Sequence, residues 1–325
     1  MKAITRRALL QAAAPLALAS AWPVHAQEQY PNRPIRLVVP FPAGALTDSL
    51  GRIVAERLRP VLGQPLVVEN RPGSGTLLGA AVIAKSAPDG YNLMVATSTT
   101  LAIAPAMYAT PAAVPSDLTG VAMIGTVALF LVTRKDLKVS NLPELVTEMR
   151  NRPGQLNYGS PGSGTMHHLI IELLKIEEKV SAVHVPYQGS MTALTDLISG
   201  RIDFMFLDAV AALPQIQAGK INVLAVAVDK RLASMPQLPT VAEIYPRLDL
   251  QAWQTISAPK GTPADLVNRL NAEINKSLGS AEGRVALANV GVEAKPMSVT
   301  ALNELIARDE KRLGDLVRSI GLKAT

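Results

Sequence analysis

IRLVVPFPAGALTD, residues 35–48, and LNYGSPGSGT, residues 156–165, repeat one local design about 120 residues apart in the chain. Each stretch begins with a strand-like run and continues into a glycine-rich turn. The apolar-periodic residues that follow each turn predict a helix. The first turn of a helix carries unpaired backbone N–H groups and the positive end of the helix dipole, so both turns are candidate anion-binding sites.

The first 26 residues are predicted to be an export signal and not part of the fold. Residues 1–7 are basic, residues 8–21 are apolar, and Val24-His25-Ala26 has the small residues of a cleavage site. The apolar run is shorter than the ~20 residues that a transmembrane helix needs. The Arg6-Arg7 pair leaves both the Sec and the twin-arginine export routes open. Either route would place the mature protein in the periplasm.

Composition excludes several kinds of protein. Without Lys2, Arg6 and Arg7 of the signal, the formal net charge falls from +6 to +3. This small charge and the 4% aromatic content argue against nucleic-acid binding. The chain has no cysteine, which excludes disulfides, thiolate catalysis and cysteine-based metal sites. The length favours two domains.

Strand-like and helical segments alternate along the mature chain, which favours an α/β fold with parallel sheets covered on both faces. The apolar run 121–132 is too short for a membrane span and is predicted to form buried strands. The amphipathic pattern over residues 301–320 predicts a helix packed on a core. Other strands are expected at 35–39, 66–68, 93–96, 181–185, 203–206 and 223–226, and other helices at 142–150, 191–199 and 265–278.

In the first turn, the hydrogen-bond donors are expected to be Ala43, Gly44 and Ala45, because the two prolines before Gly44 have no backbone N–H. Thr47 or Asp48 is the expected N-cap of the helix that follows. The Asp48 carboxylate has a second interpretation, in which it accepts a hydrogen bond from a ligand hydroxyl, amine or water.

The second turn offers three glycines, two serines and a threonine within residues 159–165. Small residues allow a ligand to approach the backbone closely, and the hydroxyl groups add donors. Thr165 is the expected N-cap, which places His168 in the first helical turn. The helix dipole disfavours a cation there, so His168 is expected to be neutral, either as a ligand contact or as a structural residue.

No motif in the sequence indicates catalysis, a metal or a cofactor. Gly162-Ser163-Gly164 does not fit the nucleophile-elbow pattern, and no metal-ligand spacing of histidines is present. The run 73–79 resembles a relaxed dinucleotide motif but lacks the acidic ribose ligand at the required spacing. We therefore expect a protein that is not an enzyme and binds no cofactor. The alternative is an exported hydrolase-like enzyme that acts on a carboxylate or an ester.

Several motifs together resemble the Bug family, the periplasmic solute-binding proteins of tripartite tricarboxylate transporters. They occur in family order and cover essentially the whole mature chain. These motifs are YPNRPIRLVVPFPAG (30–44), VENRPG (68–73), APDGY (87–91), LNYGS (156–160), HVPY (184–187), LP (213–214), LPTVAE (238–243) and APKGTP (258–263).

The resemblance implies a type II periplasmic binding protein fold, in which two α/β domains with two crossovers enclose a ligand cleft. By analogy, domain 1 comprises residues 27–126 and 252–325, and domain 2 comprises residues 127–251. A ligand carboxylate would be held by backbone amides and waters from both glycine turns.

The resemblance also implies a set of ligand-binding residues. The first turn contributes one group, the second turn contributes another, and the pocket walls come from the 97–104 segment and from the residues around positions 187 and 208. The set comprises Phe41, Ala43, Gly44, Ala45, Thr47, Asp48, Ser98, Ser160, Gly162, Ser163, Gly164, Thr165, His168, Tyr187 and Asp208.

The chain departs from the family pattern at several positions where polar or small residues are common. Here these positions hold Ala45, Leu77, Leu101, Ala104 and Leu207. A less polar pocket would favour a monocarboxylate with an apolar or aromatic body over a tricarboxylate.

The function implied is capture of a small organic acid by an exported, monomeric binding protein. The ligand would bridge the two domains and stabilise the closed state through contacts that are missing when the cleft is open. The protein would then deliver its ligand to membrane transporter subunits or present it to a membrane sensor.

Overall fold

The computed structural model describes residues 30–323, and the predicted export signal lies outside them. All strands and helices of this range belong to one compact unit, Arg33–Thr325. Within the described range, no helix combines the length and the apolarity that crossing a membrane requires.

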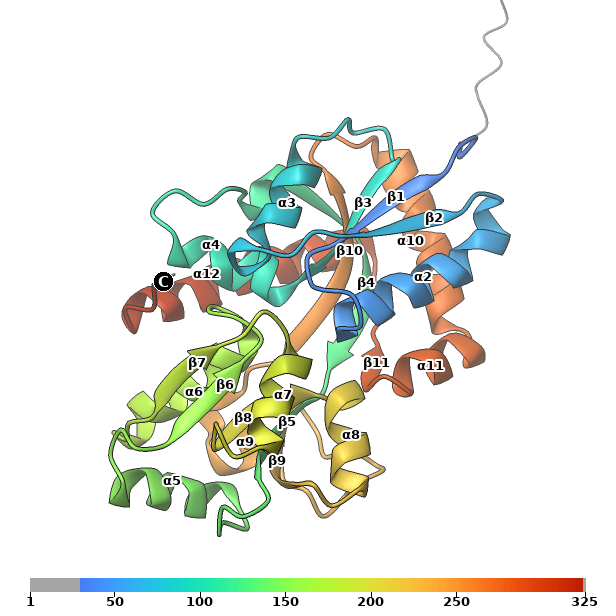
Figure 1. The fold of residues 1–325 in the computed structure, drawn as a ribbon. Helices are drawn as coiled ribbons and strands as arrows, with labels where there is room; N and C mark the ends of the chain where they lie inside the picture. The colour runs from blue at the N-terminus through green and yellow to red at the C-terminus, as the bar shows by residue number, and fades with distance from the viewer. Residues whose placement is uncertain (1–29, 324–325) are drawn as a thin grey trace, which may run out of the picture. The chain divides into compact units, whose positions relative to one another are not determined.

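The first sheet has six strands in the order β11-β4-β10-β3-β1-β2 (Figure 1). Strands β1, β2 and β3 run parallel to one another, whereas β10 and β11 pair antiparallel with their neighbours. The strands are β1 (Ile35–Val39), β2 (Leu66–Asn70), β3 (Asn92–Thr97), β4 (Leu118–Val127), β10 (Ala252–Pro259) and β11 (Val292–Ala294).

The second sheet has five strands in the order β7-β6-β8-β5-β9. Strand β6 pairs parallel with β7 and β8, and β5 pairs antiparallel with β8 and β9. The strands are β5 (Leu129–Arg134), β6 (Asn157–Ser160), β7 (Val183–Pro186), β8 (Phe204–Asp208) and β9 (Ile221–Ala227).

The prediction of parallel sheets is therefore wrong, because both sheets are mixed. Strand β4 continues almost directly into β5, and the chain returns to the middle of the first sheet as β10. These strands pass between the sheets without the helical crossover that a parallel connection needs, so they insert antiparallel. The predicted buried strands in the run 121–132 are confirmed as β4 and β5.

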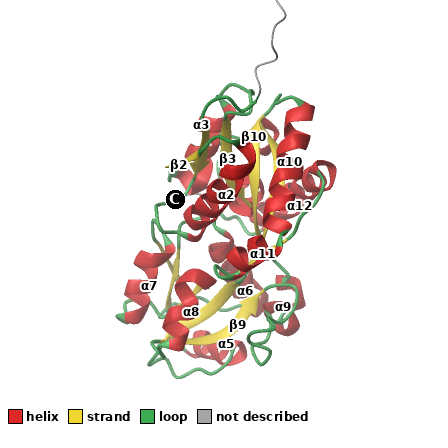
Figure 2. Cartoon of the chain, turned by 90° about the vertical axis from the view of Figure 1, so that its right-hand side faces the viewer, coloured by secondary structure: helices red, strands yellow, loops and turns green. Residues whose placement is uncertain are grey.

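Helices lie around both sheets (Figure 2). They are α2 (Leu46–Leu62), α3 (Leu77–Ala84), α4 (Ala104–Met107), α5 (Leu142–Asn151), α6 (Met166–Glu178), α7 (Ser190–Ile198), α8 (Ala209–Gln217), α9 (Val241–Ile244), α10 (Ala264–Gly279), α11 (Ala281–Ala288) and α12 (Val299–Ser319). A short helical segment, η2 (Thr99–Ile103), follows β3. The predicted amphipathic helix is confirmed as α12, which buries its apolar face on β4 and η2.

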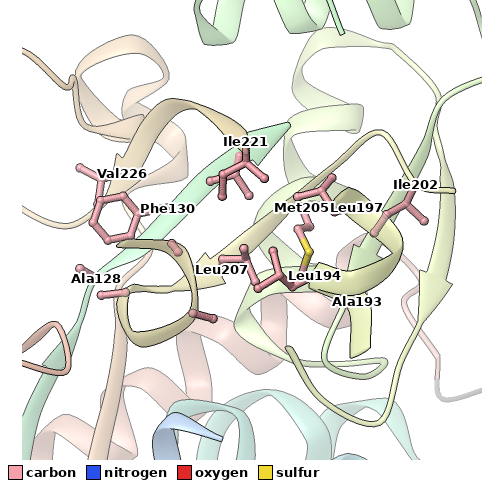
Figure 3. Close-up of a cluster of buried hydrophobic side chains, with 14 of the residues drawn as sticks. Ala128, Phe130, Ala193, Leu194, Leu197, Ile202, Met205, Leu207, Ile221 and Val226 are labelled. Atoms are coloured by element: carbon pink, nitrogen blue, oxygen red, sulfur yellow. The ribbon is translucent and has the colours of Figure 1, made fainter. Parts of the chain in front are cut away.

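Each sheet has its own apolar core. In the core of the second sheet, Met205 and Leu207 lie beside Leu194 and Leu197 of α7, and Phe130 lies beside Val226 (Figure 3). In the first sheet, Val38 and Met94 pack with residues of α3 and α12. Successive side chains of a strand point to opposite faces of the sheet. Because these strands are apolar at successive positions, both faces of each sheet are apolar and are covered by helices.

Candidate functional site

The first glycine turn connects β1 to α2, and its polar groups bond within the turn. The backbone N–H of Gly44 donates to the Asp48 carboxylate at 3.0 Å. The same carboxylate accepts hydrogen bonds from Arg52 Nε and Asn70 Nδ2, each at 3.0 Å. The N-cap residue is Ala45, so the prediction of Thr47 or Asp48 as N-cap is wrong. Asp48 instead lies inside the first turn and reaches back to Gly44.

These contacts set the ionisation of Asp48. Burial raises the pKa of the Asp48 carboxyl, but hydrogen bonds from Arg52, Gly44 and Asn70 and the charge of Arg52 outweigh it, so its pKa lies below the ordinary value. The ionised carboxylate is thus part of the structure of the turn.

Replacing Asp48 with Asn is expected to destabilise the protein by about 1–3 kcal/mol, because a hydrogen-bonded, buried acceptor loses its charge. Urea unfolding of the variant measures this loss. Asp315→Asn is the control, since Asp315 pairs with Lys311 and Arg318 on an exposed surface of α12 and such pairs contribute little. Equal stability of the two variants would contradict the structural role of Asp48.

The second glycine turn connects β6 to α6. Thr165 is the N-cap as predicted, because its Oγ1 accepts the backbone N–H of His168 at 3.4 Å. The backbone N–H of Gly164 donates to His168 Nδ1 at 3.1 Å. A ring nitrogen that accepts a hydrogen bond carries no proton, so His168 is neutral, as the helix dipole predicts. The side chain of His168 is buried and supports the turn from within.

An aromatic stack lies beneath this turn. The rings of His168 and His184 are stacked with centroids 3.7 Å apart, and Tyr158 stacks on His184 at 4.9 Å. Ser160 Oγ lies 2.7 Å from His184 Nε2, and the hydroxyl of Tyr158 donates to Glu172. Sequence analysis assigned no role to His184, since its partners lie far away along the chain.

Burial controls the titration of both stacked histidines. Desolvation, with the charges of His184 and Lys175, lowers the pKa of His168 to about 3. Desolvation also lowers the pKa of His184 to about 4, although Glu172 acts in the opposite direction. Both rings are therefore neutral at neutral pH.

A small cavity of about 40 Å³ lies between the two sheets, with room for only a few water molecules. Its walls come from both glycine turns, from the segment after β3, and from β4, β5, β8 and β10. The lining residues are Phe41, Ala45, Leu46, Thr47, Thr97, Ser98, Thr99, Val127, Leu129, Pro161, Thr165, Met166, His167, Ser190, Asp208, Ala252, Trp253 and Gln254.

Segments from the two sheets touch directly beside this cavity. The backbone N–H of Met166, at the start of α6, donates to Thr99 Oγ1 of η2 at 3.3 Å. The side chain of Met107, at the end of α4, packs against Gly164. The site is therefore in a closed arrangement, and a ligand can enter only when the sheets separate.

Some of the predicted site residues line the cavity. These are Phe41, Ala45, Thr47, Ser98, Thr165 and Asp208. The others lie around the turns without lining it. They are Ala43, Gly44, Asp48, Ser160, Gly162, Ser163, Gly164, His168 and Tyr187. The hydroxyl of Tyr187 donates to Asp196 at 2.8 Å.

The N–H groups of Gly44 and Gly164, which were expected to bind the anion, already donate within their own turns. In the first helical turns, the backbone N–H groups of Leu46, Thr47 and His167 have no intrahelical acceptor. All three residues line the cavity. The candidate donors to a ligand anion are therefore the backbone N–H groups in the first turns of the two helices, and not those of the glycines.

The predicted site residue Asp208 belongs to a polar cluster on the cavity wall whose other members were not predicted. Ser190 Oγ donates to Asp208 Oδ2 at 2.9 Å, and His167 Nε2 lies 3.3 Å from Asp208 Oδ1. Burial raises the pKa of Asp208, but the nearby His167 and the hydrogen bond from Ser190 lower it below its usual value. Trp253 and Gln254 complete this wall from β10, and Trp253 Nε1 donates to Asp309 at 2.8 Å.

The leucines that suggested an apolar ligand body do not contribute to the cavity. Leu77, Leu101 and Leu207 are buried, the latter two within the cores of the first and second sheets, and Ala104 is buried as well. None of these four residues lines the cavity. They therefore give no support to an apolar or aromatic ligand.

The part of the chain that the structure describes holds no group of three or more His, Asp or Glu side chains arranged to bind a metal ion. The site is instead built from helix N-termini, hydroxyl groups and one buried carboxylate.

Comparison with known proteins agrees with this architecture. The family model described as tripartite tricarboxylate transporter family receptor matches residues 50–322. The chain is 36% identical to protein BugT of Bordetella pertussis, over 91% of this chain and 92% of BugT.

Two solved structures are similar along nearly their whole length. R. palustris Rpa4515 with adipate has a TM-score of 0.86 and 34% identity, covering 91% of this chain and 100% of that one. MatC of Rhodopseudomonas palustris with bound malate has a TM-score of 0.82 and 31% identity, covering 89% and 100%. These matches confirm the predicted two-domain periplasmic binding protein fold. The chain belongs to the tripartite tricarboxylate transporter family receptors, the Bug family of solute-binding proteins.

Proposed function

We propose that this protein is a periplasmic receptor that captures a small carboxylate between its two sheets and delivers it to a tripartite tricarboxylate-type membrane transporter. One observation carries the proposal: both glycine turns begin helices whose first residues line a single cavity. Two helix N-termini that converge on one cavity favour a bound anion. The adipate and malate in the two similar structures support a carboxylate as that anion.

The backbone N–H groups of Leu46, Thr47 and His167 are the proposed donors to the carboxylate. Thr165 and Ser98 add hydroxyl groups beside them. Hydrogen bonds to a charged group contribute about 1.5–3 kcal/mol each, so a few such donors can hold a carboxylate without an arginine. Gly44 and Gly164, which were predicted to bind the anion, would contribute indirectly, since they shape the turns that orient these donors.

The domain assignment follows from this mechanism. Residues 27–126 with 252–325 would form domain 1, and residues 127–251 would form domain 2. Ligand contacts made by both domains favour the closed arrangement, and they are lost when the domains separate. The protein would act as an exported monomer, with Sec and twin-arginine export both open.

Hydrolysis is the alternative function. Ser160 and His184 form a hydrogen-bonded pair of the kind that a serine nucleophile requires. However, Ser160 is 0% exposed, so a substrate has no access to its hydroxyl. This burial favours binding over catalysis.

A screen of unmodified organic acids tests the proposal. An acid present at 100 times its Kd is expected to stabilise the protein by about 2.7 kcal/mol, which thermal unfolding detects as a higher Tm. Mass spectrometry of the recovered acid is the companion measurement, because a receptor returns its ligand unchanged. Turnover of a bound acid or ester would show that the protein is an enzyme.

A further inference from the structure

The cavity that the two helix N-termini line also carries hydrogen-bond acceptors, Asp208 and Gln254. Asp208 is the N-cap residue of α8, yet its side chain does not cap that helix. Its carboxylate is held instead by Ser190 and lies beside His167. Asp208 is 8% exposed, so nearly all its contacts are with the protein and with the cavity that it lines.

In the described lining of this cavity, His167 is the single side chain that can carry a positive charge beside Asp208. Among the described residues that line the cavity, there is no lysine or arginine, and Asp208 is the only acid. His167 is the only histidine in this lining, and its Nε2 makes no hydrogen bond with good geometry to any described residue. The ionised Asp208 carboxylate retains acceptor capacity beyond these two neighbours, so a ligand in the cavity can donate a hydrogen bond to it or place a positive charge beside it.

Gln254 adds a second acceptor to the same cavity. Its side chain is 6% exposed, and its Oε1 accepts no hydrogen bond from any residue of the described range. A buried amide oxygen without a donor loses the hydrogen bonds that water would supply. Gln254 lies on β10 of the first sheet, whereas Asp208 ends β8 of the second, so one ligand could bond to both sheets at this wall.

We propose that this cavity selects a carboxylate that also carries a hydrogen-bond donor, an amino acid or a hydroxy acid, and discriminates against a second carboxylate. The selectivity rests on the proposed function, since the first carboxylate is held by the helix N-termini. The donor of the ligand then pairs with Asp208 and the Gln254 oxygen. A second carboxylate at that position meets a like charge in a site of low dielectric constant.

Isothermal titration calorimetry with matched acids tests this selectivity. One series is 4-aminobutanoate, 4-hydroxybutanoate, butanoate and butanedioate, and a second series puts the same end groups on a six-carbon chain, ending with adipate. The wild type is expected to bind an amino or hydroxy acid at least tenfold more tightly than the matched plain acid and dicarboxylate. Asp208→Asn is expected to reduce this preference about tenfold. Adding Gln254→Met to that variant should reduce the preference further.

Asp265→Asn is the control, because it removes the same charge from an exposed position of α10 outside the cavity. It should leave the order of affinities unchanged. A dicarboxylate that binds most tightly to the wild type, or a preference that survives Asp208→Asn, would overturn the proposed selectivity while leaving carboxylate binding intact. Failure of every acid to bind would instead overturn the proposed function together with this selectivity.

Discussion

Acidification from pH 8 to pH 5 is expected to lower the free energy of unfolding by about 4 kcal/mol through His168 and His184 alone. The pKa of His168 is lowered to about 3 and that of His184 to about 4, whereas an unfolded histidine titrates near 6.5. At pH 5 the unfolded chain therefore binds two protons that the folded chain does not. Typical domains are stable by only about 5–15 kcal/mol, so the loss is large.

The sign follows from proton linkage. A histidine whose pKa is depressed in the folded state contributes its full stability above pH 6.5 and loses it as the pH falls toward the folded value. Each histidine costs about 2 kcal/mol at pH 5, because its unfolded form is then almost fully protonated. Both rings lie in the stack beneath the second glycine turn, so protonation would also break the Gly164 to His168 hydrogen bond.

Urea unfolding at pH 8, 6.5 and 5 measures this dependence. The control is the double variant His168→Asn, His184→Gln, whose amides place acceptors near the bonded ring nitrogens and do not titrate. Its stability should fall much less between pH 8 and pH 5, because it lacks the two side chains that take up protons only in the unfolded chain. The other titrating groups are the same in both proteins. Parallel stability curves for the two proteins would refute the assignment of the acid sensitivity to this stack.

Replacing Gly164 with Ala is expected to weaken ligand binding about thirtyfold. A Cβ at this position would lie 2.1 Å from Sδ of Met107, whose buried side chain would have to shift to admit it. Overpacking of this kind costs about 2 kcal/mol, which is about thirtyfold in Kd. Met107 belongs to α4 and Gly164 to the turn before α6, so the clash opposes the closed arrangement in particular.

Two further variants separate this effect from backbone strain. Gly164 has a φ of +76°, which disfavours any residue with a Cβ. Gly63 at the end of α2 has a φ of +69° with nothing near its Cβ position, so Gly63→Ala should reduce stability while preserving affinity. Adding Met107→Ala to Gly164→Ala should restore much of the affinity. Calorimetry with the tightest acid from the screen provides the measurement, and unchanged affinity in Gly164→Ala would contradict a closed binding state.

Local patterns in the sequence predicted much of the fold. The turns after β1 and β6, the helices that follow them and the amphipathic α12 each depend on a few neighbouring residues. The direction of β5 and β10 could not be predicted in this way. It depends on the route by which the chain leaves and re-enters a sheet, and no local pattern encodes that route.

The candidate site was less predictable for a related reason. The sequence indicated two anion-binding turns, but it could not show that the N–H groups of Gly44 and Gly164 bond to Asp48 and His168. The cavity wall joins residues from β8, α7 and β10, which are far apart in the chain. A serine, a histidine and a glutamine of this kind look ordinary in sequence until the fold brings them together.

The position of Trp253 makes it a candidate intrinsic fluorescence probe. The chain has two tryptophans, and the other, Trp22, lies within the predicted export signal. If the signal is cleaved as predicted, all tryptophan fluorescence comes from Trp253, a residue of the cavity lining whose indole packs in the core of the first sheet and donates to Asp309. A change in its emission on addition of an acid would therefore report a rearrangement at the cavity without a label.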